Sequence, residues 1–600
     1  MTPERTRALV DRAEALLSTG LVREANAVLR AAVTTRVPEA LLLAARCALR
    51  DDDPVTARAL AAEAEASFRA ANRSFWVPVA QAIALRAGAS GSTPAPVPTS
   101  TPGRAGTPPP ASPPTPAGPP TPVGAPGPTN VLDPTNTPAP SNTPSPSNTS
   151  GLTNTPTPAD VIAAASAVAA ACDEHGHHDD AAELRLALLP AEAAARRHRG
   201  TTRSRAAGWL ARARLATTRR DAVAACRAGL ALHDTTTSGE LVDIALDHAL
   251  DSTDARAVLH WGERRRAAAP APTPEVGEVR AELRLARVRG DQDRVAYLER
   301  EVRRLSFAAG PAREPVVPLS DVLGALGDRA LLMFISHRGR LVAVSVAAGR
   351  VRLHDCGDAR TAARHVRAIS LATASPAVTG FPATAPHAVA ELDRLLRPAG
   401  DRGLVVVPSP ELARLPWAAL PSARGRAVSV APSAGCWFRA HSRPLALGRR
   451  LWVAGPDLRH AQREVESLRR AHGGEFRSTV DGALSGMAQA DVVHIAAHGV
   501  RQDELFSYLQ LEDGPLHGHD LDSLAKVPPI VVLSACESGL ARVLLRRGAR
   551  VVVESVRSVP DDRVVDLMID LHADLARPAQ ALADAQARHG ELGFVCVGAG

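Results

Sequence analysis

The chain has 600 residues, of which 45% are hydrophobic and only 3% aromatic. This length exceeds what one hydrophobic core can serve, so we expect about two to four domains built from closely packed Ala- and Leu-rich elements. The formal net charge is +7. Acidic residues nevertheless alternate with the arginines along most of the chain, which argues against a nucleic-acid partner.

Several features predict a cytoplasmic protein. The first residues lead into an amphipathic helix without the apolar segment of a signal peptide. No stretch approaches the roughly 18 apolar residues of a membrane span, so no membrane partner is expected. The seven cysteines are scattered and lack CxxC spacing, which fits a reducing compartment. The Arg- and Ala-rich bias, with Lys526 as the only lysine, is typical of a GC-rich, actinobacterial genome.

Residues 1–310 read as two helical regions around a linker. In residues 1–88, apolar residues recur at helical spacing, with a turn expected at 18–20. Residues 89–159 are dominated by Pro, Thr and Ser and have no apolar face to bury, which predicts a disordered linker. In residues 160–310, helix pairs recur at roughly 30–40 residues, which favours a tetratricopeptide-like solenoid over a generic helical bundle. The predicted pairs are 163–172 with 180–188, 206–217 with 220–232, 239–249 with 254–266, and 278–289 with 291–305.

Residues 316–600 have a different pattern. A hairpin over 330–346 is followed by short apolar runs that alternate with helices. This alternation predicts an α/β/α sandwich around a mostly parallel sheet. The expected strands after the hairpin are 404–407, 428–430, 451–454, 492–496, 530–533, 551–553 and 594–597.

Two of these strands end on reactive side chains. The strand at 492–496 is followed by His498 and Gly499, and the strand at 530–533 by Cys536. Because the carboxyl ends of parallel strands meet at the same edge of a sheet, we expect the imidazole and the thiol to lie in one cleft. A thiol and an imidazole together can cleave a peptide bond. A strand-end histidine and a buried core thiol are the plainer alternatives for each residue alone.

The C-terminal half also resembles a known family, the CHAT domain. This caspase-like peptidase domain often follows tetratricopeptide repeats and is related to separases. Two residues depart from the pattern of the family, namely Arg557 at a position that is usually aromatic and Glu591 at one that is usually Trp. The segments that carry the resemblance are 406–420, 431–434, 494–499, 509–516, 532–539, 548–552, 578–582 and 594–598.

The residue types then suggest roles. Cys536 would be the nucleophile, since a thiolate attacks a peptide carbonyl directly. His498 would protonate the leaving amine. The backbone N–H groups of Gly499 and Cys536 would bind the oxyanion. A helix expected to begin near Ser538 would favour the thiolate.

A metal site is not expected. His494 and His498 are four residues apart, and His517, His519 and Cys536 could complete a ligand set. However, this segment lacks the glutamate of HExxH and lies on a strand pattern rather than on a helix, so we predict no metal and no other cofactor. His494 is assigned to the core, and His517 with its following glycine to a turn. Three further cysteines are assigned to packing, namely Cys356, Cys436 and Cys596.

The substrate pocket is predicted around the segment 510–513. Caspase-fold enzymes that cut after Arg or Lys need a buried acid, and metacaspases supply it two positions before the cysteine, where this chain has Ser534. Solvated turn or helix-cap roles are the alternative for the acidic members. The predicted pocket residues are Gln510, Leu511, Glu512, Asp513, Ser534 and Glu537.

Taken together, the sequence predicts a cysteine endopeptidase that cleaves a protein partner. Its helical repeats would bind an activating or sensor protein and regulate the peptidase. The family resemblance implies a bacterial conflict or programmed-death system. The alternative is a non-catalytic scaffold whose caspase-like domain serves as a docking module.

Overall fold

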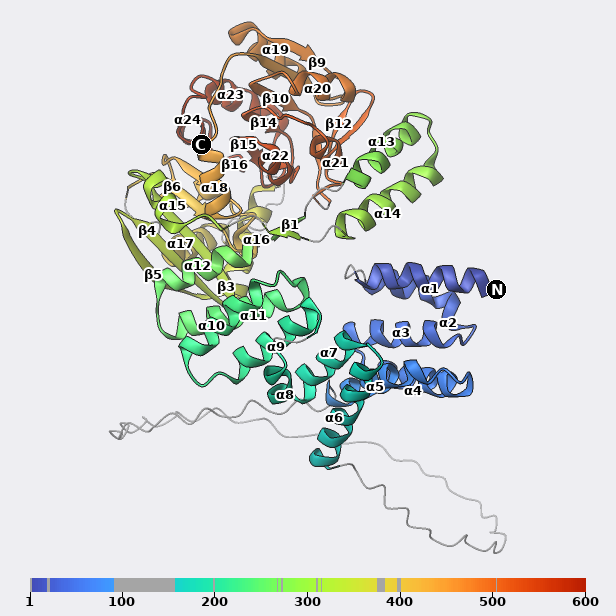
Figure 1. Ribbon diagram of the computed structural model, residues 1–600. Coiled ribbons are helices and arrows are strands. Elements are labelled where there is room, and N and C mark those ends of the chain that lie inside the picture. The colour runs from blue at the N-terminus through green and yellow to red at the C-terminus, as the bar shows by residue number, and fades with distance from the viewer. Residues whose placement is uncertain are drawn as a thin grey trace, which may run out of the picture.

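The structure, a computed structural model, describes residues 3–18, 22–90, 157–197, 200–266, 268–270, 274–308, 311–313, 316–374, 384–396, 401–502 and 504–600 (Figure 1). The predicted turn at 18–20 and nearly all of the predicted linker at 89–159 lie outside these residues. The described parts form a helical N-terminal region and a C-terminal, mostly parallel sheet with helices on both faces. The predicted fold class is therefore confirmed.

The N-terminal region begins with helices that pack against their neighbours in the chain. Alanines at helical spacing allow close contact, and larger side chains such as Leu29 and Phe68 fill the two cores between them. The helices are α1 (Pro3–Ser18), α2 (Val22–Val33), α3 (Pro38–Arg50), α4 (Pro54–Ala70) and α5 (Val77–Ser90).

The second helical stretch continues from the first. Ala82 of α5 shares a core with Ala165 and Leu184, so the two stretches are packed together. Hydroxyl and carboxylate caps, such as Thr157 and Asp234, accept the backbone N–H three residues later and fix where helices begin. The helices are α6 (Pro158–Glu174), α7 (His178–Leu188), α8 (Pro190–Ala195), α9 (Thr202–Leu215), α10 (Arg219–Leu230), α11 (Thr235–Asp251) and α12 (Ala255–Arg266).

The last helix pair leaves this stack. Helices α13 (Pro274–Val288) and α14 (Gln292–Ala308) follow the short strand β1 (Ala268–Pro270), which pairs antiparallel with β2 (Pro311–Arg313) after the helices. The pair lies beside the C-terminal domain (Figure 1). Phe506 of that domain is buried in the core of the helix pair.

The C-terminal domain is built on an 11-stranded sheet in the order β5-β4-β3-β6-β7-β16-β15-β14-β10-β8-β9. Neighbouring strands are parallel except between β5, β4 and β3 and between β16 and β15. All seven apolar runs predicted after the hairpin are strands of this sheet. The strands are β3 (Ala330–His337), β4 (Arg340–Ala347), β5 (Arg350–Asp358), β6 (Leu404–Val407), β7 (Val428–Val430), β8 (Arg450–Ala454), β9 (Glu475–Arg477), β10 (Val492–Ala496), β14 (Ile530–Ser534), β15 (Val551–Ser555) and β16 (Phe594–Gly598).

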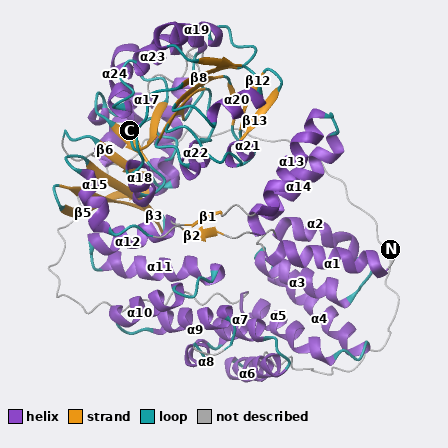
Figure 2. Ribbon diagram, turned by 45° about the horizontal axis from the view of Figure 1, so that its top comes forward, coloured by secondary structure: helices purple, strands orange, loops and turns teal. Residues whose placement is uncertain are grey.

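Helices cover both faces of this sheet (Figure 2). Successive residues of β3 alternate between two cores, with Leu332 and Phe334 on one side and Leu331 and Met333 on the other. Helices α11 and α12 pack in the second of these cores, so the helical region and the sheet are continuous. The remaining helices are α15 (Leu319–Leu326), α16 (Ala359–Ala374), α17 (Thr384–Leu396), α18 (Ala434–His441), α19 (Ala461–His472), α20 (Val480–Met487), α21 (Gly518–Asp522), α22 (Ala541–Arg547), α23 (Asp561–His572) and α24 (Pro578–His589), with 3₁₀ turns at Ser74–Trp76, Pro410–Leu412, Trp417–Ala419 and Pro421–Ala423.

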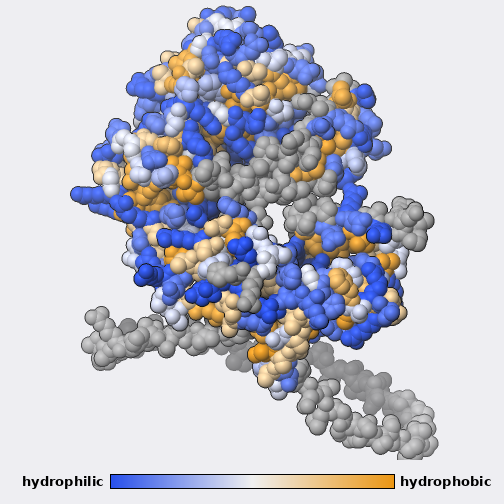
Figure 3. Space-filling view, viewed as in Figure 1, coloured by the Kyte–Doolittle hydropathy of each residue, from blue (hydrophilic) through white to orange (hydrophobic). Residues whose placement is uncertain are grey.

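The surface is mixed in polarity. On the face drawn in Figure 3, hydrophilic residues cover most of the described area and apolar residues form small patches. Among the helices of the described ranges, none combines the length and the apolar character that crossing a bilayer requires.

Candidate active site

The histidine and cysteine strands are neighbours in the sheet. Strand β10 pairs in parallel with β14, with Ala496 opposite Ser534. The N–H of Ala497 donates to the carbonyl of Ser534 at 3.3 Å, which extends the pairing by one residue. His498 and Cys536 each lie two residues beyond the last paired positions. The register therefore brings both to the same edge of the sheet.

Gly499 lies against the backbone of Cys536. A Cβ atom at Gly499 would be 2.0 Å from the carbonyl oxygen of Cys536, a distance that no other residue type could accommodate. Strand β11 (His498–Val500) can approach the cysteine segment only because this position is glycine. The structure thus supplies a packing reason for the His-Gly sequence.

His498 is exposed, and Nε2 of its ring lies 3.4 Å from the carbonyl oxygen of Asp457. Asp457 follows β8 and has a φ of 59°, in the left-handed region that Asp tolerates better than most residues. Its carbonyl helps to orient the imidazole. Sequence reasoning missed this residue, although the segment Gly455-Pro456-Asp457 has the composition of a turn.

Cys536 is partly buried, and its Sγ accepts the backbone N–H of Val559 at 3.3 Å. Both residues of the expected dyad are described, and no hydrogen bond joins the His498 ring to Sγ. Proton exchange between them therefore requires a side-chain rotation or a seated substrate, as is common in enzymes without substrate.

The helix after Cys536 begins later than predicted. Helix α22 starts at Ala541 rather than near Ser538 and has seven residues. The Glu554 carboxylate accepts from Ser538 Oγ at 3.1 Å and from Ala541 N–H at 3.3 Å, so it caps the helix where the chain becomes helical. Burial raises the pKa of Glu554. The predicted helix start near Ser538 is therefore three residues too early, and the stabilisation of a thiolate by this helix stays a prediction.

The predicted pocket residues divide into two groups. Gln510 pairs directly across from His498 in the small sheet that β11 forms with β12 (Tyr508–Leu511) and β13 (Gly514–His517). Leu511 is fully buried and Ser534 is 7% exposed within its strand, so neither presents its side chain at the surface. Of this group, only Gln510 is placed beside the imidazole.

The acidic pocket residues already have partners. Glu512 accepts from the hydroxyl of Ser478, and Asp513 accepts the N–H of Val480 at 2.8 Å, where α20 begins. Glu537, next to the cysteine, forms an ion pair with Arg414. The alternative role of a turn or helix cap fits Glu512 and Asp513.

Comparison with known families identifies this part of the chain. Residues 384–590 match the family model of the CHAT domain. Residues 384–590 form a CHAT domain. The match covers about a third of the chain and includes both strands that carry His498 and Cys536. No curated protein matches the sequence.

Two solved structures are similar in overall shape. Both are crystal structures of the Saccharomyces cerevisiae separase–securin complex, with TM-scores of 0.46 and 0.43 and 8% sequence identity. Each alignment covers 99% of this chain but 53% of the matched chain, so this chain spans about half the length of those proteins.

Three other cysteines of the C-terminal domain have thiols with raised pKa values. Desolvation raises the pKa of Cys356 and of Cys436 to about 11 and that of Cys596 to about 12. Thiols with such pKa values are almost entirely protonated near neutral pH and are poor nucleophiles. They fit the packing role predicted for them.

His494, a residue of β10, belongs to a buried polar cluster between the sheet and helices α19 and α23. Its Nε2 lies 2.7 Å from Oε1 of Glu464, and its Nδ1 lies 3.1 Å from Nε2 of His572. Burial lowers the pKa of His572 well below its usual range. The side chain of His494 is completely buried, which fits the predicted core position.

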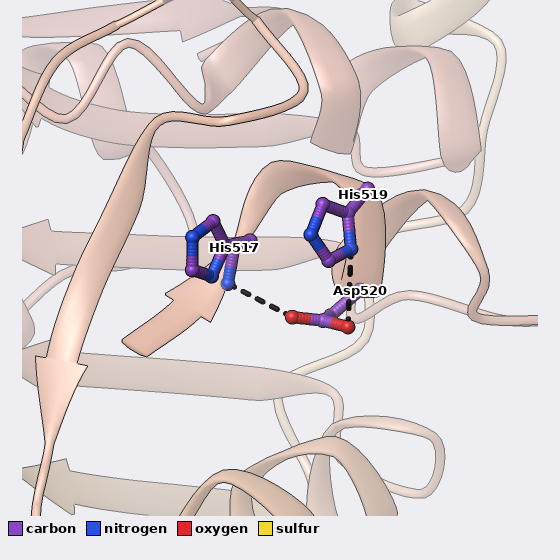
Figure 4. A group of neighbouring side chains, drawn as sticks. All are labelled: His517, His519 and Asp520. Atoms are coloured by element: carbon purple, nitrogen blue, oxygen red, sulfur yellow. Dashed lines mark hydrogen bonds and ion pairs between the residues drawn. The ribbon is translucent and has the colours of Figure 1, made fainter. Parts of the chain in front are cut away.

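His517, His519 and Asp520 form a second histidine cluster of the CHAT domain (Figure 4). Asp520 accepts the N–H of His517 at 3.0 Å, and its other oxygen lies 3.2 Å from Nδ1 of His519. Nη1 of Arg287 lies 3.1 Å from Nδ1 of His517 and 3.1 Å from Nε2 of His519. A guanidinium can only donate hydrogen bonds, so these two contacts require an unprotonated nitrogen on each ring, whereas Nδ1 of His517 also lies 3.1 Å from the carbonyl oxygen of Pro515. The positive charge of Arg287 beside both rings disfavours a metal cation at this cluster.

The two departures from the family pattern contact each other. Nη2 of Arg557 lies 2.8 Å from Oε2 of Glu591, and both side chains are largely buried. Desolvation raises the pKa of Glu591 and lowers that of Arg557. The sequence marks each residue as unusual for the family, but it does not indicate that the two form an ion pair.

Proposed function

We propose that this protein is a cysteine endopeptidase that cleaves a protein partner, with Cys536 as nucleophile and His498 as acid–base catalyst. The observation that carries the proposal is the parallel register of β10 and β14, which brings the two residues to one edge of the sheet. Their side chains differ from those of the buried cysteines and histidines because His498 is exposed and Cys536 is partly so.

The chemistry would proceed in two steps. The Cys536 thiolate attacks the peptide carbonyl, and the N–H groups of Gly499 and Cys536 stabilise the oxyanion. His498 gives a proton to the leaving amine, and an acyl-enzyme remains. A water molecule that loses its proton to His498 then hydrolyses the thioester and restores the thiol.

The helical region contacts the segment next to this site, which supports regulation by the repeats. Arg280 of α13 forms a buried ion pair with Asp522 at 2.8 Å, and Phe506 is buried among α13 and α14. Phe506 lies two residues before β12, which pairs with the strand of His498. A sensor protein that moved the helix pair would therefore act on the histidine strand. The bacterial conflict or programmed-death setting rests on the family resemblance.

The test compares the protein with a Cys536→Ala variant and a Cys436→Ala variant in cells. Mass spectrometry of new protein N-termini should show cleavage products with the native chain and with Cys436→Ala, which removes another partly buried thiol. Cys536→Ala should remove them. Cleavage by Cys536→Ala would exclude the mechanism.

The alternative is a non-catalytic scaffold, and one observation favours it: the imidazole and the thiol are not hydrogen-bonded to each other. The two hypotheses differ in the reactivity of Cys536. An iodoacetamide probe should label Cys536 ahead of the other thiols if it serves as a nucleophile. Labelling without preference for Cys536 would support the scaffold.

A further inference from the structure

The loop after β15 passes directly beside the thiol of Cys536. Within it, the N–H of Val559 donates to Sγ at 3.3 Å. The carbonyl of Arg557 accepts the N–H of Glu537 at 3.4 Å. The loop is therefore bonded both to the sulfur and to the residue that follows the cysteine.

Arg557 and Glu591 tie this loop to the segment that precedes β16. Nη2 of Arg557 donates to the carbonyl of Glu591 at 2.7 Å and to its carboxylate at 2.8 Å. The N–H of Val556 donates to the carbonyl of Gly593 at 2.9 Å. A Cβ at Gly593 would lie 2.4 Å from Cγ of Arg557, so only glycine leaves room for the arginine. The Arg557 side chain therefore extends past Gly593 to reach Glu591.

The ion pair between Arg557 and Glu591 is expected to add little to the net stability of the fold. The side chains are 6% and 16% exposed, and burying two charges costs about as much as their attraction returns. Nε and Nη1 of Arg557 have no hydrogen-bond partner within the described protein, which adds to the cost. What the pair provides is fixed geometry, because the planar guanidinium binds the carbonyl and the carboxylate at once.

We propose that Arg557 and Glu591 are positioning residues for Cys536. Their ion pair holds the loop 556–559, and the Val559 amide in turn holds the direction of Sγ. The inference rests on the proposed role of Cys536 as nucleophile, and it adds two residues that touch neither substrate nor sulfur.

The experiment measures how fast iodoacetamide alkylates Cys536, by peptide mass spectrometry over a series of pH values. The variants are Glu591→Gln, Arg557→Met and the double variant Arg557→Met/Glu591→Leu. The control is Arg185→Met, since Arg185 and Asp173 form an ion pair of similar burial, 4% and 23% exposed, in α6 and α7. If the pair had only a structural role, the variants and the control would all have a lower melting temperature, and the alkylation rate of Cys536 would not change.

Glu591→Gln and Arg557→Met should each slow alkylation about tenfold and displace its pH profile, because a small misplacement of a nucleophile has effects of this order or larger. Arg185→Met should leave both unchanged. A wild-type rate and pH profile in folded Glu591→Gln, which keeps the size of the side chain, would overturn the proposal even if Arg557→Met fails to fold. Cleavage plays no part in the readout. A reactive Cys536 without any cleaved protein would therefore refute the proposed function and leave this inference standing.

Discussion

The CHAT domain contains two His-Gly pairs on one small sheet, and they behave differently. His498 and Gly499 open β11, whereas His517 closes β13 and Gly518 begins α21. Each glycine is required by a close backbone contact, with Cys536 at Gly499 and with the carbonyl of Glu504, 2.2 Å from a Cβ, at Gly518. His498 is exposed, whereas His517 is buried and faces Arg287.

The difference shows that the dipeptide itself reports only backbone packing. Glycine is needed wherever two backbones approach closely, whatever the neighbouring side chain does. The surroundings of the imidazole decide its chemistry, since only an exposed ring at a sheet edge can meet a substrate. The same substitution made in each His-Gly pair tests whether the two pairs differ in this way.

The largest effect is expected from replacing the two histidines. His498→Gln should lower kcat/KM for a cleaved protein about 10²–10⁴-fold, the usual contribution of a general acid–base, and leave the melting temperature near that of the native chain. His517→Gln should lower the melting temperature, because it removes a buried ring from the contact with Arg287, without abolishing cleavage. Similar losses of activity in both variants would remove the distinction drawn between the pairs.

Substitution of the two glycines should have similar effects on the stability of the protein and different effects on the reactivity of Cys536. Gly499→Ala and Gly518→Ala should each destabilise the protein by about 1–3 kcal/mol in urea unfolding, because each Cβ would overlap a carbonyl oxygen. Only Gly499→Ala should also slow alkylation of Cys536. Gly324→Ala is the control, since a Cβ there meets nothing within 4 Å. If Gly518→Ala slowed alkylation equally, the two contacts would not be separable.

A smaller and more local effect is expected from Arg287→Met. The substitution leaves buried ring nitrogens of His517 and His519 without their donor, a cost of about 1–2 kcal/mol. Amide hydrogen exchange should accelerate in β12 and β13 and in α13, but not in α23. The pair Arg588–Asp570, whose arginine is exposed, offers a control, because Arg588→Met should leave exchange in β12, β13 and α13 unchanged. Unchanged exchange in Arg287→Met would show that the helix pair is held by other contacts.

The smallest effect is a dependence of stability on pH. Burial, with Arg287 nearby, lowers the pKa of His517 to about 3, and burial also lowers that of His519, although Asp520 opposes the shift. These rings are neutral in the folded protein but take up protons below 6.5 when unfolded. The contribution of His517 to stability is therefore complete above pH 6.5 and is lost as the pH falls from 6.5 towards about 3, and that of His519 changes in the same direction. Melting temperatures should fall less steeply with acid in His517→Gln, and an identical slope would contradict this assignment.

The main strands could be predicted because they are short valine-rich runs between helices. Strand β5 was not predicted, because its residues are mostly polar and exposed at the edge of the sheet, so no apolar run marks it. The start of α22 was misplaced because the cap that fixes it, Glu554, comes from a different strand. Local sequence patterns contain no information about such a partner.

The residues of the candidate site could likewise be predicted only in part from the sequence. Cys536 and His498 stand out because each follows an apolar strand, and their proximity follows from the order of parallel strands. Asp457 could not be found in this way, since its role depends on a carbonyl and a positive φ. The ion pair between Arg280 of α13 and Asp522 could not be predicted either, because the two residues are far apart in the sequence.

Strand β16 has a consequence for the protein while it is being made. It comes last among the strands in chain order, yet it lies between β7 and β15 and is the sole link between the two blocks of the described sheet. During synthesis, Cys536 is added to the chain before residues 591–598. The loop beside the sulfur then lacks its contacts with Glu591 and Gly593, so the thiol can reach its final surroundings only after β16 has been synthesised and has joined the sheet.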